Sequence, residues 1–219
     1  MTVCNTSAPH DGDKPDPKDP TACQSTPSWL SLVQRALHRN RSHPASRYLQ
    51  LATVDAQGSP HNRTLVFRGF LPSTQQLRLA TDSRSEKLEQ IQHSSQAEIC
   101  WYFTKTREQF RITGSIQPIT ANHPGRAEQA QRQQLWQELS SSGKLLWYWP
   151  QPKTEQADMS LYPQQLPDTA NQPPETFVLL LLTPTAVDHL QLQGDGLYPQ
   201  CRQLYWLKQG QWQTLKVNP

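Results

Sequence analysis

The sequence lacks long apolar runs and blocks of basic charge. Its 219 residues carry a formal net charge of only +3, and 35% of them are hydrophobic. The longest apolar run, Phe177 to Leu182, is too short to cross a bilayer. The scattered lysines and arginines do not form the basic patch of a nucleic-acid-binding protein. We therefore expect a protein whose partners are neither membranes nor nucleic acids.

Cysteine and glycine motifs are also missing. The four cysteines, at positions 4, 23, 100 and 201, form no C-x-x-C pair, and no cysteine or histidine lies at zinc-ligand spacing. The sequence has no G-x-S-x-G, P-loop or G-x-G-x-x-G motif. The N-terminus lacks the apolar segment of a secretory signal. These absences predict a reducing, cytoplasmic setting.

Local composition divides the chain into a leader and one domain. Residues 1–24 are poor in apolar groups and rich in Asp, Pro and Lys, so we expect a disordered leader. Residues 25–219 form the predicted domain, which includes a loop over 150–174 with six prolines. A loop of this length in a compact domain is usually functional or disordered.

Alternating apolar and polar residues predict about eight strands. They cover 48–54, 62–70, 76–81, 97–103, 109–118, 176–182 with a continuation toward 192, 202–207 and 212–217. Helical spacing predicts helices that begin near Ser28, at 84–92 with Ser83 as N-cap, at about 124–139 and at 144–149. Many strands with few helices predict a mainly β, antiparallel barrel.

Hydroxyl and basic side chains gather where strand 76–81 meets helix 84–92. The sequence there is Thr81-Asp82-Ser83-Arg84-Ser85-Glu86-Lys87. A helix N-terminus with such groups is a natural site for a phosphate. Arg63, on the preceding strand, adds a guanidinium that suits phosphate oxygens. A single strand arginine is more often solvated, so this interpretation rests on the whole pattern.

The order of these motifs resembles the pyridoxamine-phosphate-oxidase-like FMN-binding family. That family combines an R-x-x-L-x-K strand, a Y-T-N strand end, an S-R-K helix start and an R-Q-V strand. The corresponding segments here are Arg63–Arg68, Ala80–Asp82, Ser85–Lys87 and Gln109–Phe110. Segments 202–205 and 210–219 match the family's R-F-L-Y and closing W-K-I-x-x-L-x-P. The resemblance implies an FMN-binding split barrel, an antiparallel Greek-key barrel with a few flanking helices, that forms a homodimer with FMN between its subunits.

The resemblance also implies which residues contact FMN. Those assigned to the phosphate are Arg63, Thr81, Ser85 and Lys87. Those whose backbone passes beside the flavin rings are Thr64, Leu65, Val66 and Phe67, with Ala80 at the matching strand end. The same segment is equally an ordinary barrel strand, and the two interpretations are compatible.

Four further residues complete the predicted flavin site. Gln109 would contact FMN from the partner subunit, and Arg202 matches a late FMN arginine. Gln151 lies in a segment that resembles W-V-x-K-Q-S, although its aromatic residues also suit a hydrophobic plug. The family's arginine before Lys87 is replaced by Glu86. Arg84 either supplies the missing cation or is an exposed arginine at the helix start.

The substrate side departs most from the family. Arg68 retains a positive charge where the family has a substrate-binding lysine, but the R-x-H segment aligns with residues 198–200, which hold neither Arg nor His. The sequence therefore predicts an FMN-dependent oxidoreductase that acts on an unidentified small molecule, with no catalytic side chain identified. The alternatives are a non-catalytic flavin- or haem-binding sensing module and a structural dimer with a degenerate pocket.

Overall fold

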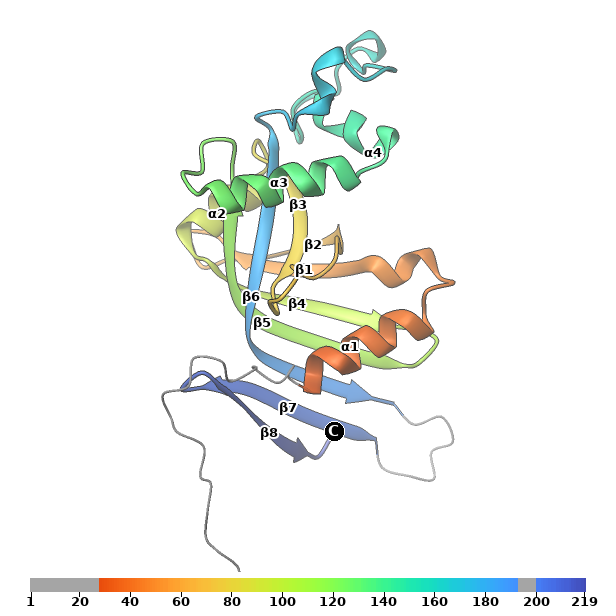
Figure 1. Ribbon diagram of the computed structural model, residues 1–219, viewed down its shortest axis with the longest axis vertical. Helices are drawn as coiled ribbons and strands as arrows, with labels where there is room; N and C mark the ends of the chain where they lie inside the picture. The colour runs from red at the N-terminus through yellow and green to blue at the C-terminus, as the bar shows by residue number, and fades with distance from the viewer. Residues whose placement is uncertain (1–27, 193–199) are drawn as a thin grey trace, which may run out of the picture.

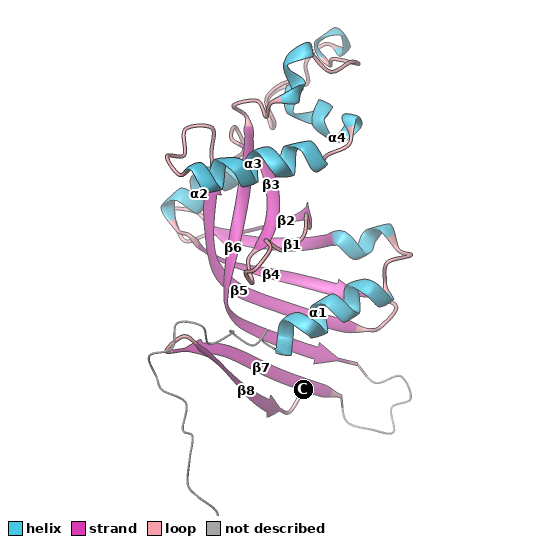
Figure 2. Cartoon of the chain, viewed as in Figure 1, coloured by secondary structure: helices cyan, strands magenta, loops and turns pink. Residues whose placement is uncertain are grey.

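The computed structural model describes residues 28–192 and 200–219, which form an antiparallel β structure with helices at its surface (Figures 1 and 2). The predicted leader and most of the 198–200 segment lie outside the described residues. The strands are β1 Tyr48–Val54, β2 Pro60–Val66, β3 Leu77–Asp82, β4 Gln96–Phe103, β5 Glu108–Ile119, β6 Phe177–Gln191, β7 Cys201–Lys208 and β8 Gln211–Val217. The helices are α1 Ser28–Arg39, α2 Glu86–His93, α3 Arg126–Glu138 and α4 Ser141–Leu145, with short 3-10 helices η1 Pro44–Arg47, η2 Leu146–Tyr148, η3 Met159–Leu161 and η4 Asp168–Asn171.

Hydrogen bonding joins the strands in the order β2-β1-β4-β5-β6-β7-β8. β6 is long enough to have two partners on one edge, because its first half pairs with β3 and its second half with β7. β3 and β2 therefore form the two sides of an almost closed barrel. The connection that follows β2 joins β3 through the isolated bridge between Phe70 and Leu77 and through backbone hydrogen bonds of Arg68 and Gly69 with Arg78. This confirms the predicted split barrel.

The apolar run that begins β6 is buried on both faces. Val178, Leu180 and Leu182 face the barrel interior, where they join the main core. Phe177, Leu179 and Leu181 pack instead on a second cluster beneath α3. A strand covered on both faces reads as a continuous hydrophobic run rather than as an alternating one. As predicted, the strand then continues past Pro184, and it ends at Gln191.

A β-bulge accommodates the proline within β6. The register of β5 and β6 shifts between Thr113 and Gly114, opposite Pro184. Proline lacks a donor for the ladder and is tolerated in a sheet mainly at such irregularities. Gly114 is required there because a Cβ atom would lie 2.2 Å from the carbonyl oxygen of Thr183.

The chain leaves β2 earlier than the alternation predicts. β2 ends at Val66 instead of continuing to Phe70, since the next amides donate elsewhere. Phe67 N donates to the carbonyl of Arg47 at 2.7 Å, and Arg68 N donates to the carbonyl of Arg78 at 2.9 Å. β2 therefore ends where the chain turns from β1 toward β3.

The first turn of α2 also differs from the prediction. The helix begins at Glu86, with Ser85 as N-cap, rather than at Arg84 with Ser83 as N-cap. The reason is a turn at the end of β3, where the carboxylate of Asp82 accepts from Arg84 N at 2.8 Å. Ser83 N donates to the carbonyl of Thr176 at 2.8 Å and so belongs to the sheet side of this turn.

One buried carboxylate lies at the far end of β5. Glu108 is fully buried, and its Oε1 lies 3.3 Å from His189 Nε2 and 3.7 Å from Arg35 Nη2. Burial raises the pKa of this carboxyl, but the polar contacts of His189 and Thr106 and the charges of His189 and Arg35 outweigh it, so the pKa of Glu108 is lowered. The ionised carboxylate of Glu108 therefore contributes to the contact of β5 with His189 of β6.

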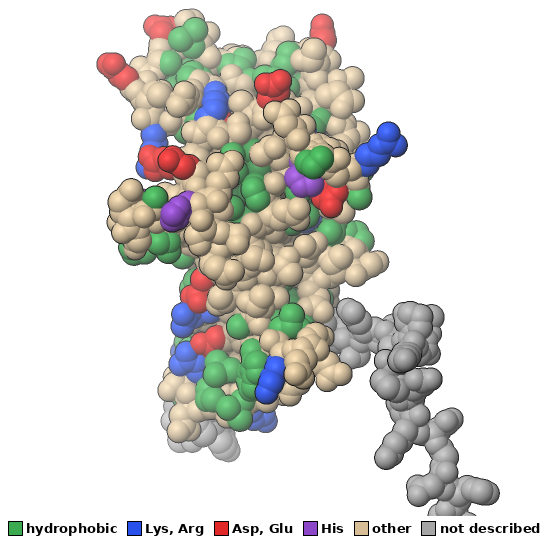
Figure 3. Space-filling model, turned by 90° about the vertical axis from the view of Figure 1, so that its left-hand side faces the viewer, with side chains coloured by type: hydrophobic (Ala, Val, Ile, Leu, Met, Phe, Trp, Pro, Cys, Tyr) green, Lys and Arg blue, Asp and Glu red, His purple; other side chains and the backbone are tan. Residues whose placement is uncertain are grey.

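The described surface carries mixed charge. On the face in Figure 3, Lys and Arg side chains alternate with Asp and Glu side chains, and hydrophobic side chains gather toward its lower end. No helix among residues 28–192 and 200–219 combines the length and apolar character needed to span a membrane.

Candidate functional site

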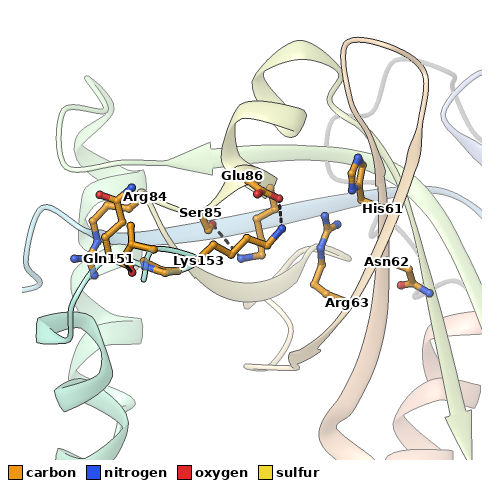
Figure 4. Close-up of a pocket in the computed structure, with 11 residues that line it drawn as sticks. His61, Asn62, Arg63, Arg84, Ser85, Glu86, Gln151 and Lys153 are labelled. Carbon is orange, nitrogen blue, oxygen red and sulfur yellow. Dashed lines mark hydrogen bonds and ion pairs between the residues drawn. The ribbon is translucent and has the colours of Figure 1, made fainter. Parts of the chain in front are cut away.

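A cavity of about 450 Å³ opens where the end of β3 turns into α2, between β2 and the segment that follows η2 (Figure 4). This volume lies within the roughly 300–1,000 Å³ of small-molecule sites. Its lining residues are His61, Asn62, Arg63, Arg84, Ser85, Glu86, Lys87, Gln151, Pro152, Lys153 and Thr154. The cavity thus contains five of the predicted cofactor-binding residues: Arg63, Arg84, Ser85, Lys87 and Gln151.

Arg63 reaches into the cavity from β2 and is held in place by neutral acceptors. Its Nη1 donates to the carbonyl of Leu51 at 3.2 Å and to Thr53 Oγ1 at 2.5 Å, and its Nη2 donates to Gln90 Oε1 at 2.7 Å. These bonds leave the Nε–H and one Nη2–H for a ligand. Burial lowers the pKa of this guanidinium. A half-buried cation without a carboxylate bonded to it favours an anionic ligand.

The turn from β3 into α2 supplies hydroxyls and a second cation. Thr81 Oγ1 and Ser85 Oγ are 3.1 Å apart, and Ser85 Oγ donates to the carbonyl of Asp82 at 2.7 Å. Lys87 Nζ donates to Ser85 Oγ at 3.0 Å. Burial, followed by repulsion from Arg63, lowers the pKa of Lys87. Two cations that repel each other in a half-buried site bind a phosphate more readily than either would alone.

Thr81 itself does not line the cavity. Its side chain is buried, and its hydroxyl reaches the site only through Ser85. Its carbonyl accepts from Trp147 Nε1 at 3.3 Å, which fixes the segment after α4 against the end of β3. Ala80 lies one residue earlier and packs against the second core cluster, also away from the cavity.

Arg84 is already neutralised by a neighbouring carboxylate. Its Nε and Nη2 donate to the two carboxylate oxygens of Asp82, at 3.0 and 2.6 Å, and its Nη1 donates to the carbonyl of Trp149 at 3.0 Å. The hydrogen bonds that Arg84 donates to Asp82 raise the pKa of Arg84. Arg84 therefore connects the turn before α2 to the segment that contains Trp149. Its charge is paired with Asp82 and is not available to a ligand in the cavity.

Glu86 and Lys153 face one another across the mouth of the cavity (Figure 4). Their side chains form an ion pair between α2 and the proline-rich segment. The hydrogen bond from Lys153 lowers the pKa of Glu86. On the β2 side, His61 Nε2 lies 2.9 Å from Asp55 Oδ2, and this contact lowers the pKa of Asp55.

The backbone predicted to run beside a flavin is only partly open. β2 is an edge strand that pairs with β1 on one side only, so along Thr64, Leu65 and Val66 the backbone groups point alternately toward β1 and toward the split. The amides of Phe67 and Arg68 are occupied by bonds within the protein, and the Phe67 ring is buried in the core. Flavin contact by the first three residues therefore stays a prediction, and the amide of Phe67 is not free for a ligand.

Arg68 lies outside the cavity, in the connection between β2 and β3. Its side chain is half-buried, and its Nε has no hydrogen-bond partner within the described part of the chain. Burial, followed by repulsion from Arg47, lowers the pKa of Arg68. Arg68 thus retains a cation near the split but does not touch the phosphate-type cluster.

Gln109 and Arg202 lie far along the sheet from the cavity. Both are paired with Leu190, Gln109 from β5 and Arg202 from β7, so their side chains share one sheet face. Arg202 donates to both carboxylate oxygens of Asp188, at 3.0 and 2.6 Å, and this bond raises its pKa. Within one chain, the predicted site is therefore divided into two parts.

Sequence reasoning missed several lining residues. They are Asn62, Lys153 and Thr154. Asn62 directly precedes the predicted Arg63. Lys153 and Thr154 follow Gln151 in a long loop, and the length of that loop was the one signal that could have pointed to them.

The chain is similar to known proteins over most of its length. Residues 26–120 match the family model described as "Pyridoxamine 5'-phosphate oxidase, FMN-binding domain". Pyridoxine/pyridoxamine 5'-phosphate oxidase 2 of Arabidopsis thaliana is 35% identical over 191 residues, which cover 87% of this chain and 96% of the relative.

Solved structures extend the similarity to the fold. A pyridoxamine 5'-phosphate oxidase-related, FMN-binding protein of Nostoc punctiforme superposes with a TM-score of 0.84 at 46% identity, over 89% of this chain and 100% of the other. PhzG of Burkholderia lata has a TM-score of 0.71 at 20% identity, over 89% of this chain and 95% of the other, a likeness that concerns the fold alone. The chain therefore belongs to the pyridoxamine 5'-phosphate oxidase family of FMN-binding split-barrel proteins.

Proposed function

We propose that this protein binds FMN and is an oxidoreductase for a small molecule. The observation that carries the proposal is the pair of half-buried cations, Arg63 and Lys87, at the hydroxyl-lined start of α2. Their chemistry fits the phosphate of FMN, since a guanidinium and an ammonium share the charge while Ser85 supplies a hydroxyl. The similarity to FMN-binding relatives supports the same ligand.

The remaining parts of the cofactor would lie along the split. The open edge of β2 at Thr64, Leu65 and Val66 offers backbone groups for the polar edge of the ring system. Gln151 would approach from the opposite wall. When bound, FMN supplies the electron-accepting chemistry, and the residues around it hold, orient and partly desolvate it.

We also propose that the functional unit is a homodimer. Strand register places Thr64, Gln109, Leu204 and Trp206 on a common outer face of the sheet. Exposed apolar side chains lie on this face, including Trp206 and Leu215. Pairing two such faces would bring Gln109 and Arg202 of one subunit to the flavin held by the other, which would join the two parts of the site.

The substrate remains a small molecule of undefined class in this proposal. Arg68 supplies a cation near the split, and the relatives named above make pyridoxamine 5'-phosphate the first compound to test. The cysteine usage keeps the cytoplasm as the proposed compartment.

The test begins with the absorption spectrum of the purified protein and continues with titrations of FMN and riboflavin. We expect flavin bands, tighter binding of FMN than of riboflavin, and bleaching of the bound flavin by substrate under anaerobic conditions. Pyridoxamine 5'-phosphate and unphosphorylated amines would be compared as reductants. Flavin binding without turnover would favour the sensing module, a haem spectrum would favour the haem-binding alternative, and no binding of FMN would refute the proposal.

A further inference from the structure

A carboxylate, Glu86, lines the cavity beside the two cations that are proposed to bind a phosphate. Family resemblance places an arginine immediately before Lys87, and this chain has Glu86 there. A carboxylate beside a phosphate site would weaken anion binding unless a cation neutralised it. The cavity therefore requires an additional positive charge from another segment.

Arg84 does not meet this requirement. Both oxygens of the Asp82 carboxylate bind its guanidinium, and its remaining Nη1 bond goes to the carbonyl of Trp149. Bidentate pairing with a carboxylate cancels the charge and uses the donors that a phosphate would need. The cation missing at position 86 must come from elsewhere in the lining.

Lys153 is the remaining basic residue of the lining, and three observations single it out. It forms an ion pair with Glu86, although the two residues are 67 positions apart. Its side chain is 71% exposed and that of Glu86 is 52% exposed, so solvent and ligands can reach both. Its backbone has a φ of 61°, a left-handed conformation that costs a non-glycine residue free energy. Such strain persists where the surroundings determine the conformation.

The neighbouring contacts explain how this conformation is positioned. Thr154 Oγ1 donates to the carbonyl of Gln151 at 2.9 Å, which closes a tight turn around Lys153. Further back, Thr176 Oγ1 donates to the carbonyl of Trp147 at 3.1 Å, and Arg84 holds the carbonyl of Trp149. The turn that carries Lys153 is thus attached to the same strand-to-helix junction that carries Lys87.

We propose that Lys153 is a phosphate-binding residue of this site, replacing from the proline-rich segment the cation that Glu86 removes from α2. Glu86 is its positioning residue, because its carboxylate holds the ammonium at the mouth of the cavity. An ammonium has further N–H donors beyond the one that Glu86 accepts, and these are available to phosphate oxygens. This inference rests on the proposed function for the identity of the ligand, FMN.

The experiment compares FMN and riboflavin binding in the wild type, Lys153→Met and Glu86→Gln. Lys153→Met keeps an unbranched chain and the same backbone strain but removes the charge. We expect it to weaken FMN binding about tenfold, the lower end of the effect of losing a charge-assisted hydrogen bond, and to leave riboflavin binding unchanged. Lys216→Met, an exposed lysine of β8 outside the cavity whose pairing with Gln203 puts it on the sheet face opposite the proposed dimer face, is the matched control and is expected to bind both flavins like the wild type.

Glu86→Gln separates positioning from simple repulsion. If Glu86 positions Lys153, the neutral variant binds FMN a few-fold more weakly, even though the site has lost a negative charge. If Glu86 only repels the phosphate, the same variant binds FMN more tightly. Tighter binding by Glu86→Gln, or FMN binding by Lys153→Met equal to that of the wild type, would overturn the inference.

Thermal unfolding with inorganic phosphate keeps this inference distinguishable from the proposed function. We expect phosphate to raise the Tm of the wild type and to raise that of Lys153→Met less. A wild type that ignores FMN but shows Lys153-dependent protection by phosphate would refute the FMN proposal and support the role of Lys153. Equal protection of both proteins by phosphate would refute the role of Lys153.

Discussion

The replacement Arg63→Ala provides the sharpest test of the phosphate site. The wild-type guanidinium has two N–H groups free for a ligand. Hydrogen bonds to charged groups contribute about 1.5–3 kcal/mol, so the Kd for FMN is expected to rise by about 10- to 150-fold. Riboflavin lacks the phosphate, and its affinity is expected to change little.

The same replacement has a smaller effect on the apoprotein. Arg63 donates three hydrogen bonds to neutral acceptors, each of which contributes about 0.5–1.5 kcal/mol. The bond from Thr53 to Gln90 Oε1, at 2.7 Å, remains, and removing a partly buried charge offsets part of the loss. We expect a net destabilisation of about 1–2 kcal/mol, which lowers the Tm by roughly 2–8 °C in a chain of this size.

Thermal unfolding with and without FMN measures both effects together. FMN at 100 times the wild-type Kd stabilises the wild type by about 2.7 kcal/mol. A variant whose Kd is a hundredfold higher gains only about 0.4 kcal/mol under the same conditions, by the same relation. Arg126→Ala, an exposed arginine at the start of α3, is the charge-matched control. Full FMN stabilisation of Arg63→Ala would refute the reasoning.

Three further predictions concern the site, the fold and acid stability. Arg63→Ala combined with Lys87→Ala is expected to abolish retention of FMN through gel filtration while circular dichroism shows a folded barrel; retention would contradict the phosphate assignment. Gly114→Ala is expected to lower stability by about 3 kcal/mol, measured by urea unfolding, because its Cβ would lie 2.2 Å from the Thr183 carbonyl oxygen. Because the pKa of Glu108 is lowered, its carboxylate stabilises the fold above an ordinary pKa of 4.5, and this contribution is lost as the pH falls below that value. Glu108→Gln is therefore expected to be less stable than the wild type at pH 7 and to approach the stability of the wild type in acid. Parallel profiles of stability against pH for the two proteins would contradict this prediction.

Much of the barrel could be predicted from periodicity. β1 matches its predicted bounds, and β6 could be found because residues 177–182 form a continuous apolar run. The errors occur where tertiary hydrogen bonds override local pattern. β2 ends early because Phe67 N bonds to Arg47, and α2 starts late because Asp82 captures the amide of Arg84.

The candidate site was predictable where its residues belong to a recognisable motif. Ser85 and Lys87 follow from the strand-to-helix junction, and Arg63 follows from its place in the motif order. Lys153 could not be predicted, since its pairing with Glu86 spans 67 residues and its loop has no periodicity. The division of Gln109 and Arg202 from the cavity likewise depends on strand register, which the sequence does not specify by itself.

The position of β6 in the sheet has a consequence for how the chain folds. Leu77 pairs with Leu182, so the barrel cannot close until about a hundred intervening residues have been made. Such non-local pairing slows folding, and until it forms the run from Phe177 to Leu182 is an uncharged, β-prone segment able to pair with another chain. Pro174 and Pro184 flank this run, and neither has a backbone N–H to donate to the strand of another chain. We therefore expect these two prolines to make pairing of the run with another chain less favourable while the protein folds.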